Sequence, residues 1–142
     1  MQSVILAAGR GSRLGSMTND IPKGMVELGG KPILDWQSRT LIAGGADAVT
    51  IVTGYCGEVI ANYGFDTIVN DDWSHSNMLS SLDCALKTFS GPLIISYADI
   101  LYDTATVREL ITSDAPVSVA YDCDWLSLWQ RRFEDPLSDA ET

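Results

Sequence analysis

An apolar segment that runs directly into a glycine-rich turn constrains the fold of this chain most. Residues 3–8 read Ser-Val-Ile-Leu-Ala-Ala, and Gly9, Arg10 and Gly11 follow at once. Short apolar runs bounded by glycine are typical of buried strands. Glycine also lets backbone amides approach an anion without a Cβ in the way. The segment therefore predicts a buried strand that ends in a loop able to hold a phosphate group.

Two cations follow the turn. Arg13 lies two residues after Gly11, and Lys23 follows Pro22 ten residues further on. An arginine and a lysine supply the positive charge that a polyphosphate needs, the arginine through paired hydrogen bonds. The turn and these cations together predict that the chain holds a nucleoside triphosphate by its phosphates.

Two better-known phosphate-binding loops do not fit the spacing. A dinucleotide fingerprint needs a third glycine and, about 20 positions later, an acidic residue. Leu14 occupies the third glycine position, and the next strand ends at Gly54 without a carboxylate. A P-loop needs a glycine five positions ahead of its Gly-Lys pair, but Met25 stands there ahead of Gly30-Lys31. The spacing therefore disfavours an NAD-linked oxidoreductase.

A longer pattern around these residues does fit a known family. Residues 6–14 read Leu-Ala-Ala-Gly-x-Gly-x-Arg-Leu, and Thr18 and then Pro22-Lys23 follow. This pattern resembles the signature of the MobA-like NTP transferases, nucleotidyltransferases with a GT-A-like, Rossmann-related fold. The arginine-to-lysine interval resembles that of the sugar-phosphate nucleotidylyltransferases and phosphocholine cytidylyltransferases, whereas molybdenum-cofactor guanylyltransferases place the lysine nearer. Ser16 departs from the pattern, since many members have proline there.

Further segments carry the same resemblance along the chain. Residues 26–32 resemble the lead into the family's first long helix, and residues 77–82 resemble its Asn-x-x-x-Ser-Leu helix start. Residues 96–100, Ser-Tyr-Ala-Asp-Ile, resemble the strand end that carries a metal-binding aspartate. Residues 124–141 resemble a segment of uncharacterised members. The resemblance therefore extends over the whole chain.

The resemblance implies a role for each matching residue. Arg13 and Lys23 would be catalytic, on the β- and γ-phosphates and on the α-phosphate, and Asp99 would hold Mg²⁺. The implied nucleotide-binding residues are Leu6, Ala7, Ala8, Gly9, Gly11, Ser12, Arg13, Lys23, Asn77 and Ser81. The implied reaction moves a nucleotidyl group, CTP favoured, to a phosphorylated acceptor such as phosphocholine or a sugar 1-phosphate, and releases pyrophosphate.

Several of these residues have an equally simple structural explanation. The two glycines can be ordinary turn residues and Arg13 a solvated cation, although the register with Lys23 favours phosphate binding. Asp99 can cap a turn after its strand. Asn77 can serve as the cap of the helix that follows it.

Aromatic residues near the end of the sequence bear on the acceptor. Tyr121, Trp125 and Trp129 can form a cage for a quaternary ammonium group such as choline. Packing in a core accounts for aromatic residues more often, so both interpretations stay open. Trp36 falls in the middle of an expected helix, and we assign it to the core.

Charge and composition narrow the class further. The net charge of −10 argues against nucleic acid as a partner, because a phosphate backbone needs a basic face. Four cations nevertheless lie in the first quarter: Arg10, Arg13, Lys23 and Lys31. No secretory signal or apolar run of about 20 residues appears, so neither export nor a membrane span is expected. Cys56, Cys84 and Cys123 form no Cys-x-x-Cys pair, which favours buried free thiols and a cytoplasmic protein.

Alternating apolar segments predict the architecture. Strands are expected at 4–8, 48–53, 67–70, 93–97 and 117–121, and helices at 32–42, 58–63, 78–89 and 106–111. This alternation predicts an α/β, three-layer Rossmann-like fold with a mostly parallel sheet and helices on both faces. Ligands of such sheets lie beyond the carboxyl ends of the strands. The glycine loop, the region of Asn77, and Asp99 should therefore gather at one edge.

We expect residues 1–142 to form a single NTP-binding domain that lacks part of the acceptor-binding C-terminal region. Family members usually continue further, into much of the acceptor pocket and a second acidic Mg²⁺ ligand. Asp135, Asp139 and Glu141 are carboxylates near the end of this sequence. A homodimer that completes the site, or an NTP-binding module without turnover, are the alternatives to a complete enzyme.

Overall fold

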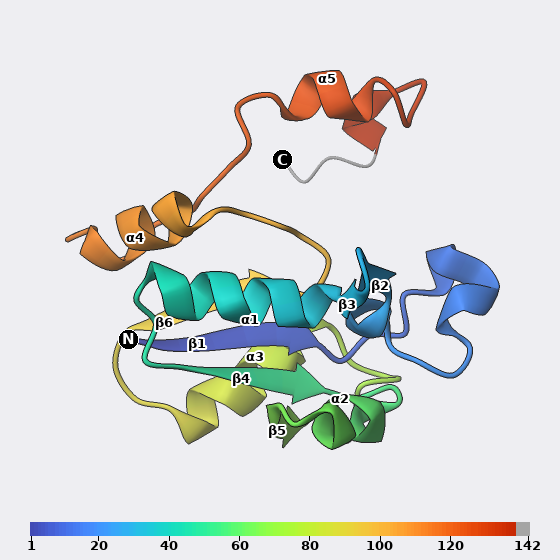
Figure 1. The fold of residues 1–142 in the computed structure, drawn as a ribbon, viewed down its shortest axis with the longest axis horizontal. Helices are drawn as coiled ribbons and strands as arrows, with labels where there is room; N and C mark the ends of the chain where they lie inside the picture. Colours follow the sequence, from blue (N-terminus) through green and yellow to red (C-terminus); the bar gives the residue numbers. More distant parts are fainter. Residues whose placement is uncertain (139–142) are drawn as a thin grey trace.

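Four parallel strands in the order β5-β4-β1-β6 form the central sheet (Figure 1). The computed structural model describes residues 1–138. The strands are β1 (Gln2–Ala7), β4 (Ala48–Thr53), β5 (Asp66–Val69) and β6 (Leu93–Tyr97). A short antiparallel ribbon joins β2 (Glu27–Leu28) to β3 (Lys31–Pro32). Four of the expected strands are thus present within two residues of their expected bounds.

Helices cover both faces of this sheet. The α-helices are α1 (Ile33–Gly44), α2 (Gly57–Tyr63), α3 (Met78–Thr88), α4 (Thr104–Thr112) and α5 (Trp125–Trp129). Three short 3₁₀ turns are η1 (Ser12–Thr18), η2 (Lys23–Met25) and η3 (Pro136–Ser138). Figure 1 shows α1 over one face of the sheet and α3 over the other. The expected α/β fold, a mostly parallel sheet with helices on both faces, is confirmed.

Side chains of β1 alternate between two cores. Ile5 packs in a cluster with Leu34 and Leu41 of α1, whereas Val4 packs with Ala85 of α3. Successive residues of a strand point to opposite faces, so a strand covered on both faces must be apolar throughout. Burial of each such Ile or Leu side chain stabilises the fold by about 1.5–3 kcal/mol. The continuous apolar run at the start of the chain is therefore the centre of the sheet.

The expected strand at 117–121 is wrong. This segment forms no strand, and Val117, Val119 and Tyr121 are about 80% exposed (80%, 79% and 81%). Figure 1 shows the chain after α4 leaving the sheet toward α5. Its β-branched composition favours a strand, but such a preference is expressed only where a neighbouring strand and a core receive the side chains. Neither is available to this segment within residues 1–138.

Two further expectations need correction. Trp36 is not a core residue: its side chain is 37% exposed and its indole nitrogen donates a hydrogen bond to the carbonyl of Leu28 at 2.8 Å. The ammonium of Lys31 lies 5.1 Å from the centre of the Trp36 ring, so the indole fastens the β2–β3 ribbon to α1. The three cysteines are free, but Cys123 is exposed and the other two are only half-buried.

Within the described residues, none of the helices combines the length and the apolar character that a bilayer crossing requires.

The contact between α1 and α4 yields a stability test. Gly44 lies in α1, and a Cβ added there would lie 2.4 Å from Cγ1 of Val107. Alanine normally stabilises a helix relative to glycine by about 1 kcal/mol. Here we expect Gly44→Ala to lower the free energy of unfolding by about 1–2 kcal/mol, because overpacking costs about 1–3 kcal/mol. Thermal unfolding followed by circular dichroism checks this, and a raised melting temperature would contradict the packing described.

Candidate functional site

The loop after β1 is held in shape by a buried threonine. Gly11 adopts a left-handed conformation (φ 72°), and its carbonyl accepts a hydrogen bond from the amide of Leu14 at 3.0 Å. The hydroxyl of Thr18, which is fully buried, donates to the carbonyls of Gly11 and Gly15 at 3.3 and 3.4 Å. The threonine of the sequence pattern therefore ties both ends of η1 together.

Lys23 packs directly on this loop. A Cβ added to Gly11 would lie 2.6 Å from Cβ of Lys23 and 3.0 Å from its Cδ. Glycine is therefore required at this position for two reasons: its left-handed backbone conformation and the space that the side chain of Lys23 occupies. Pro22 is fully buried just before the lysine and anchors the start of η2. The glycine turn and the Pro22-Lys23 pair, which are separate in the sequence pattern, are thus in direct contact in the structure.

Lys23 also reaches the end of β6. Its Nζ lies 2.5 Å from Oδ2 of Asp99, which follows β6 by two residues. β6 pairs with β1 in parallel, so the carboxyl ends of both strands lie at one edge of the sheet. The two side chains are 36% and 42% exposed, and an ion pair as exposed as this contributes only about 0–1 kcal/mol to stability. Stability therefore gives little reason for placing a lysine against this aspartate.

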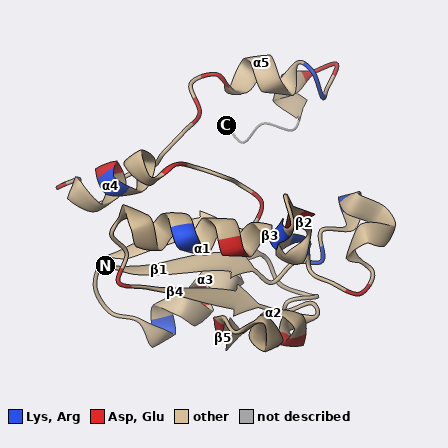
Figure 2. Ribbon diagram, viewed as in Figure 1, with Lys and Arg blue, Asp and Glu red and all other residues tan. Residues whose placement is uncertain are grey.

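The other predicted loop residues differ in exposure. Ser12 and Arg13 are exposed on η1, and Figure 2 shows Lys and Arg gathered where β1 ends, near β3 and the following loop. Leu6, Ala7 and Ala8 are at most 9% exposed. Their side chains belong to the interior, so any contact they make with a nucleotide is through the backbone.

Asn77 and Ser81 both have structural partners. Oδ1 of Asn77 accepts hydrogen bonds from the amides of Leu79 and Ser80 at 3.0 and 3.3 Å, which caps α3. The hydroxyl of Ser81 is 3.0 Å from Nδ2 of the buried Asn70, which donates to it. The cap that the sequence allowed for Asn77 is present, and a role in nucleotide binding stays a prediction for both residues.

Sequence reasoning missed a buried glutamine beside Asp99. Gln37 lies in α1, is 1% exposed, and donates from Nε2 to the carbonyls of Tyr97 and Ile100 at 2.6 and 2.5 Å. The signal was available in the sequence, because Gln37 falls between Leu34 and Leu41 on the apolar face of an amphipathic helix. A polar residue at such a position needs a partner in the interior.

A second missed contact fixes the loop from the other side. The guanidinium of Arg10 lies 5.6 Å from the ring centre of Tyr55 and donates to Oδ1 of Asn19 at 3.0 Å. The Tyr55 hydroxyl donates a hydrogen bond to the carbonyl of Asn19. The backbone amide of Tyr55 donates to the carbonyl of Ala8 at 3.0 Å. These contacts attach the loop after β1 to the loop after β4.

Two of the predicted acceptor residues lie on α5, apart from the sheet. Figure 1 shows α5, which carries Trp125 and Trp129, separated from the sheet. The Arg132 guanidinium lies 5.1 Å from the Trp129 ring centre, so a cation of this chain already covers that ring. Tyr121 is 81% exposed. The structure does not bring α5 to the sheet, and the acceptor role of all three residues stays a prediction.

Asp99 is the one predicted metal ligand, and the described residues 1–138 contain no group of three or more His, Cys, Asp or Glu placed to hold a metal ion. Mg²⁺ is commonly bound by one or two carboxylates together with substrate phosphates and water. A single carboxylate beside a phosphate-binding loop fits that mode. Asp135 precedes η3, whereas Asp139 and Glu141 lie outside the described residues.

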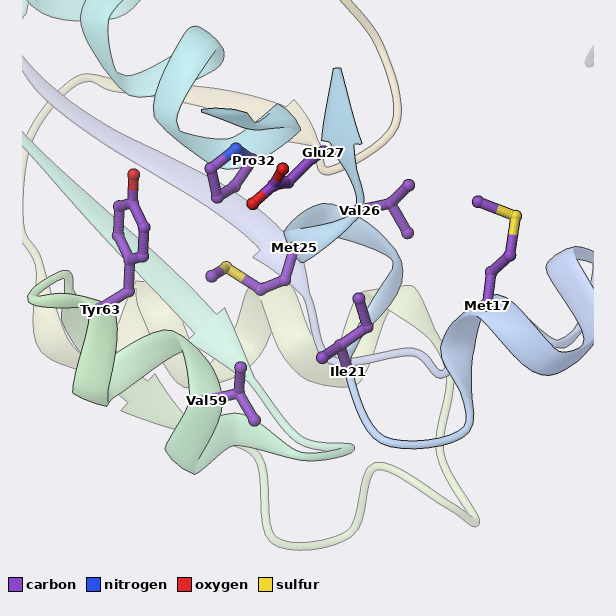
Figure 3. Close-up of a pocket in the computed structure, with 8 residues that line it drawn as sticks. All are labelled: Met17, Ile21, Met25, Val26, Glu27, Pro32, Val59 and Tyr63. Atoms are coloured by element: carbon purple, nitrogen blue, oxygen red, sulfur yellow. The ribbon is translucent and has the colours of Figure 1, made fainter. Parts of the chain in front are cut away.

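A hollow of about 550 Å³ lies elsewhere, between η1, η2 and α2 (Figure 3). Figure 3 shows Val59 and Tyr63 of α2 on one side of it and Met25 of η2 facing them. Its lining is mostly apolar: Met17, Ile21, Met25, Val26, Glu27, Pro32, Val59 and Tyr63. None of the predicted site residues lines it, so this hollow is distinct from the edge with Lys23 and Asp99.

The fold is that of the Rossmann-like nucleotidyltransferase domains. The fold matches that of the CTP:phosphocholine cytidylyltransferase of Streptococcus pneumoniae with a TM-score of 0.62 and 26% identity, over 73% of this chain and 49% of that one. Residues 3–138 match the MobA-like NTP transferase domain. The chain belongs to that family.

Two curated relatives extend the comparison. The chain is 39% identical to the CTP:phosphoglutamine cytidylyltransferase of Campylobacter jejuni, over all of this chain and 60% of that protein. It is 49% identical over 90 residues to the UTP–glucose-1-phosphate uridylyltransferase of Haloferax volcanii, covering 62% of this chain and 37% of that protein. The chain therefore spans less than two thirds of the length of either relative.

The contact between Gly11 and Lys23 can be tested without any ligand. We expect Gly11→Ala to lower the free energy of unfolding by about 1–2 kcal/mol, since a left-handed backbone alone disfavours alanine by that amount. Gly9→Ala is the matched control, because a Cβ at Gly9 meets nothing within 4 Å. Denaturant unfolding of both variants measures the difference. Equal stabilities would show that the loop does not hold the conformation described.

Proposed function

We propose that this chain is a metal-dependent nucleotidyltransferase that transfers a nucleotidyl group, CTP favoured, to a phosphorylated acceptor and releases pyrophosphate. The observation that carries the proposal is the meeting of Gly11, Lys23 and Asp99 at the carboxyl edge of the sheet. Cytidylyltransferases among the relatives support CTP, and their names give phosphoglutamine and phosphocholine as acceptors. A uridylyltransferase relative keeps UTP as the next candidate.

The reaction is an in-line displacement at the α-phosphorus. An oxygen of the acceptor phosphate forms the new P–O bond, and the bond to the β-phosphate oxygen breaks with its electrons leaving on pyrophosphate. Such transfers require little covalent work from the protein, so positioning and neutralisation of charge carry the rate. In this chain the amides of residues 9–12 would hold the phosphates, Arg13 would bind the β- and γ-phosphates, and Lys23 would neutralise the α-phosphate.

Asp99 would hold Mg²⁺ against the triphosphate, and that ion when bound neutralises phosphate charge. In the structure Asp99 is paired with Lys23 instead. The pair would open on binding of nucleotide and metal, and its exposure keeps the cost of opening to about 0–1 kcal/mol. Lysine suits this exchange of partners, because its ammonium is a compact charge on a flexible stem. The pair would thus keep both groups at the site between turnovers.

The proposal also covers the acceptor molecule, the assembly of the chain and the compartment in which it acts. Phosphocholine or a sugar 1-phosphate is the acceptor we favour, with Tyr121, Trp125 and Trp129 as candidate contacts. We propose that residues 1–142 act as one NTP-binding domain, in the cytoplasm, where the three free cysteines would remain reduced. A homodimer is the arrangement by which a second copy would complete the acceptor side.

Turnover by point variants tests the proposal. We expect Lys23→Ala and Asp99→Ala each to reduce pyrophosphate release at least about 100-fold, the usual loss when one preorganised group facing transition-state charge is removed. Lys87→Ala is the matched control, because Lys87 forms an exposed ion pair of the same 2.5 Å length with Asp83 on α3. CTP, Mg²⁺ and a panel of phospho-acceptors are assayed with each variant. Near-normal release by either site variant would overturn its role, and CTP binding without release from any acceptor would identify a binding module.

Nucleotide preference can be measured by thermal shift. We expect CTP with Mg²⁺ to raise the melting temperature more than ATP, GTP or UTP, since a ligand at 100 times its Kd stabilises the native state by about 2.7 kcal/mol. Arg13→Ala should remove most of that shift, while Arg108→Ala, an exposed change on α4, should retain it. An unchanged shift in Arg13→Ala would contradict the placement of the triphosphate on this loop.

A further inference from the structure

The turn that carries Asp99 is held by hydrogen bonds from outside its own strand. Gln37 of α1 uses both hydrogens of its amide nitrogen, one on the carbonyl of Tyr97 at 2.6 Å and one on that of Ile100 at 2.5 Å. These two carbonyls lie on either side of Asp99 in the sequence. β6 ends at Tyr97, so the hydrogen-bond ladder of the sheet does not fix residues 98–101. The backbone around Asp99 therefore depends on α1.

A short hydrogen-bonded chain completes this clamp. The Ser96 hydroxyl donates to the carbonyl of Tyr97 at 3.1 Å, and the Tyr102 hydroxyl donates to the Ser96 oxygen at 3.0 Å. Burial raises the pKa of the Tyr102 phenol, which keeps its proton available for this bond. The carbonyl of Tyr97 before Asp99 is thus held by Ser96 and Gln37, and the carbonyl of Ile100 after it by Gln37.

Stability alone does not explain a glutamine at this place. Gln37 is 1% exposed, and within the described residues its Oε1 is buried without a hydrogen-bond partner. An unpaired buried acceptor costs about 1–3 kcal/mol. Leu34 and Leu41 fill the equivalent positions of α1 with leucine and are fully buried. A leucine cannot supply the pair of donors that the two carbonyls of the Asp99 turn accept.

The same helix face also holds Lys23. Leu34 packs on Gly24, where an added Cβ would lie 2.7 Å from Cγ of the leucine. Residues three apart in a helix lie on one face, so Leu34 and Gln37 project from α1 side by side. One fixes the backbone directly after Lys23 and the other fixes the backbone around Asp99. The spacing between the backbone segments that carry Lys23 and Asp99 is therefore set by α1.

We infer that Gln37 is a positioning residue, which holds the Asp99 carboxylate where it can bind the metal of a metal–nucleotide complex. The inference rests on the proposed function, since it assigns the carboxylate to that metal. Gln37 itself touches neither metal nor nucleotide. Its loss should therefore weaken the contribution of the metal to nucleotide binding while leaving the grip of the loop on the phosphates unchanged.

Two measurements on the full 142-residue chain test this inference. The variants are Gln37→Met, which keeps length and removes both donors, and Gln37→Glu, which keeps the shape and places oxygen against the two carbonyls. Leu41→Val, one turn further along the same buried face, is the control for packing. Amide hydrogen exchange without ligand reports the turn at 98–101, and calorimetric titration gives the affinity for CTP with and without Mn²⁺.

In Gln37→Met we expect the rate of amide hydrogen exchange at residues 98–101 to rise at least tenfold. The gain in CTP affinity on adding Mn²⁺ should fall about tenfold. The affinity for CTP without metal should stay within twofold of that of the parent chain. Leu41→Val should change neither. Any of three results would overturn the inference. They are unchanged amide exchange at residues 98–101, a gain in CTP affinity on adding Mn²⁺ equal to that of the parent chain, or an equal loss of CTP affinity with and without Mn²⁺. If the parent chain binds no CTP at all, the proposed function fails and this role with it, an outcome distinct from the other three. Should Gln37→Met fail to fold, Gln37→Glu is judged by the same criteria.

Discussion

The contact between Lys23 and Asp99 is the interaction on which the geometry of this site depends. It joins residues 76 positions apart in the sequence and brings a cation and a carboxylate to the loop after β1. Its exposure makes it a weak contributor to stability, yet the surrounding backbone is arranged to produce it. Gly11 leaves space for the lysine stem, and Gln37 fixes the turn before and after the aspartate. The protein thus commits buried structure to holding two exposed charges.

The sheet explains why these two residues can meet at all. β1 lies between β4 and β6, and both neighbours run parallel to it, so the loops after the three strands leave from one edge. α1 crosses one face with Leu34 and Gln37 side by side and sets the spacing of η2 and the Asp99 turn. The contacts of Arg10 and Tyr55 attach the loop after β1 to the loop after β4. Core packing and site geometry are therefore consequences of the same helix and strands.

Most strands of the sheet could be predicted from the sequence. The environment of Trp36, the partners of Gln37 and the structure of residues 117–121 could not, each for a physical reason. Apolar runs ending at glycine or a polar residue identified four strands, because burial on both faces leaves a continuous signal. The segment at 117–121 has a composition that favours a strand, but among residues 1–138 it has no neighbouring strand, so the expected strand does not form. The assignment of Trp36 to the core was wrong because its indole nitrogen donates a hydrogen bond to a carbonyl in the β2–β3 ribbon. The place of Gln37 on the apolar face of α1 indicated a buried partner, but its partners are backbone carbonyls 60 and 63 residues away, which local periodicity does not identify.

A crystal structure of the chain with CTP and Mn²⁺ tests the central claim most directly. We expect an anomalous manganese peak bonded to the Asp99 carboxylate, the Lys23–Asp99 pair opened, and Lys23 on a phosphate oxygen above the loop at 9–12. The exposed pair needs little free energy to open, so bound nucleotide should suffice. A structure with the nucleotide elsewhere and the pair intact, or with manganese away from Asp99, would contradict the claim.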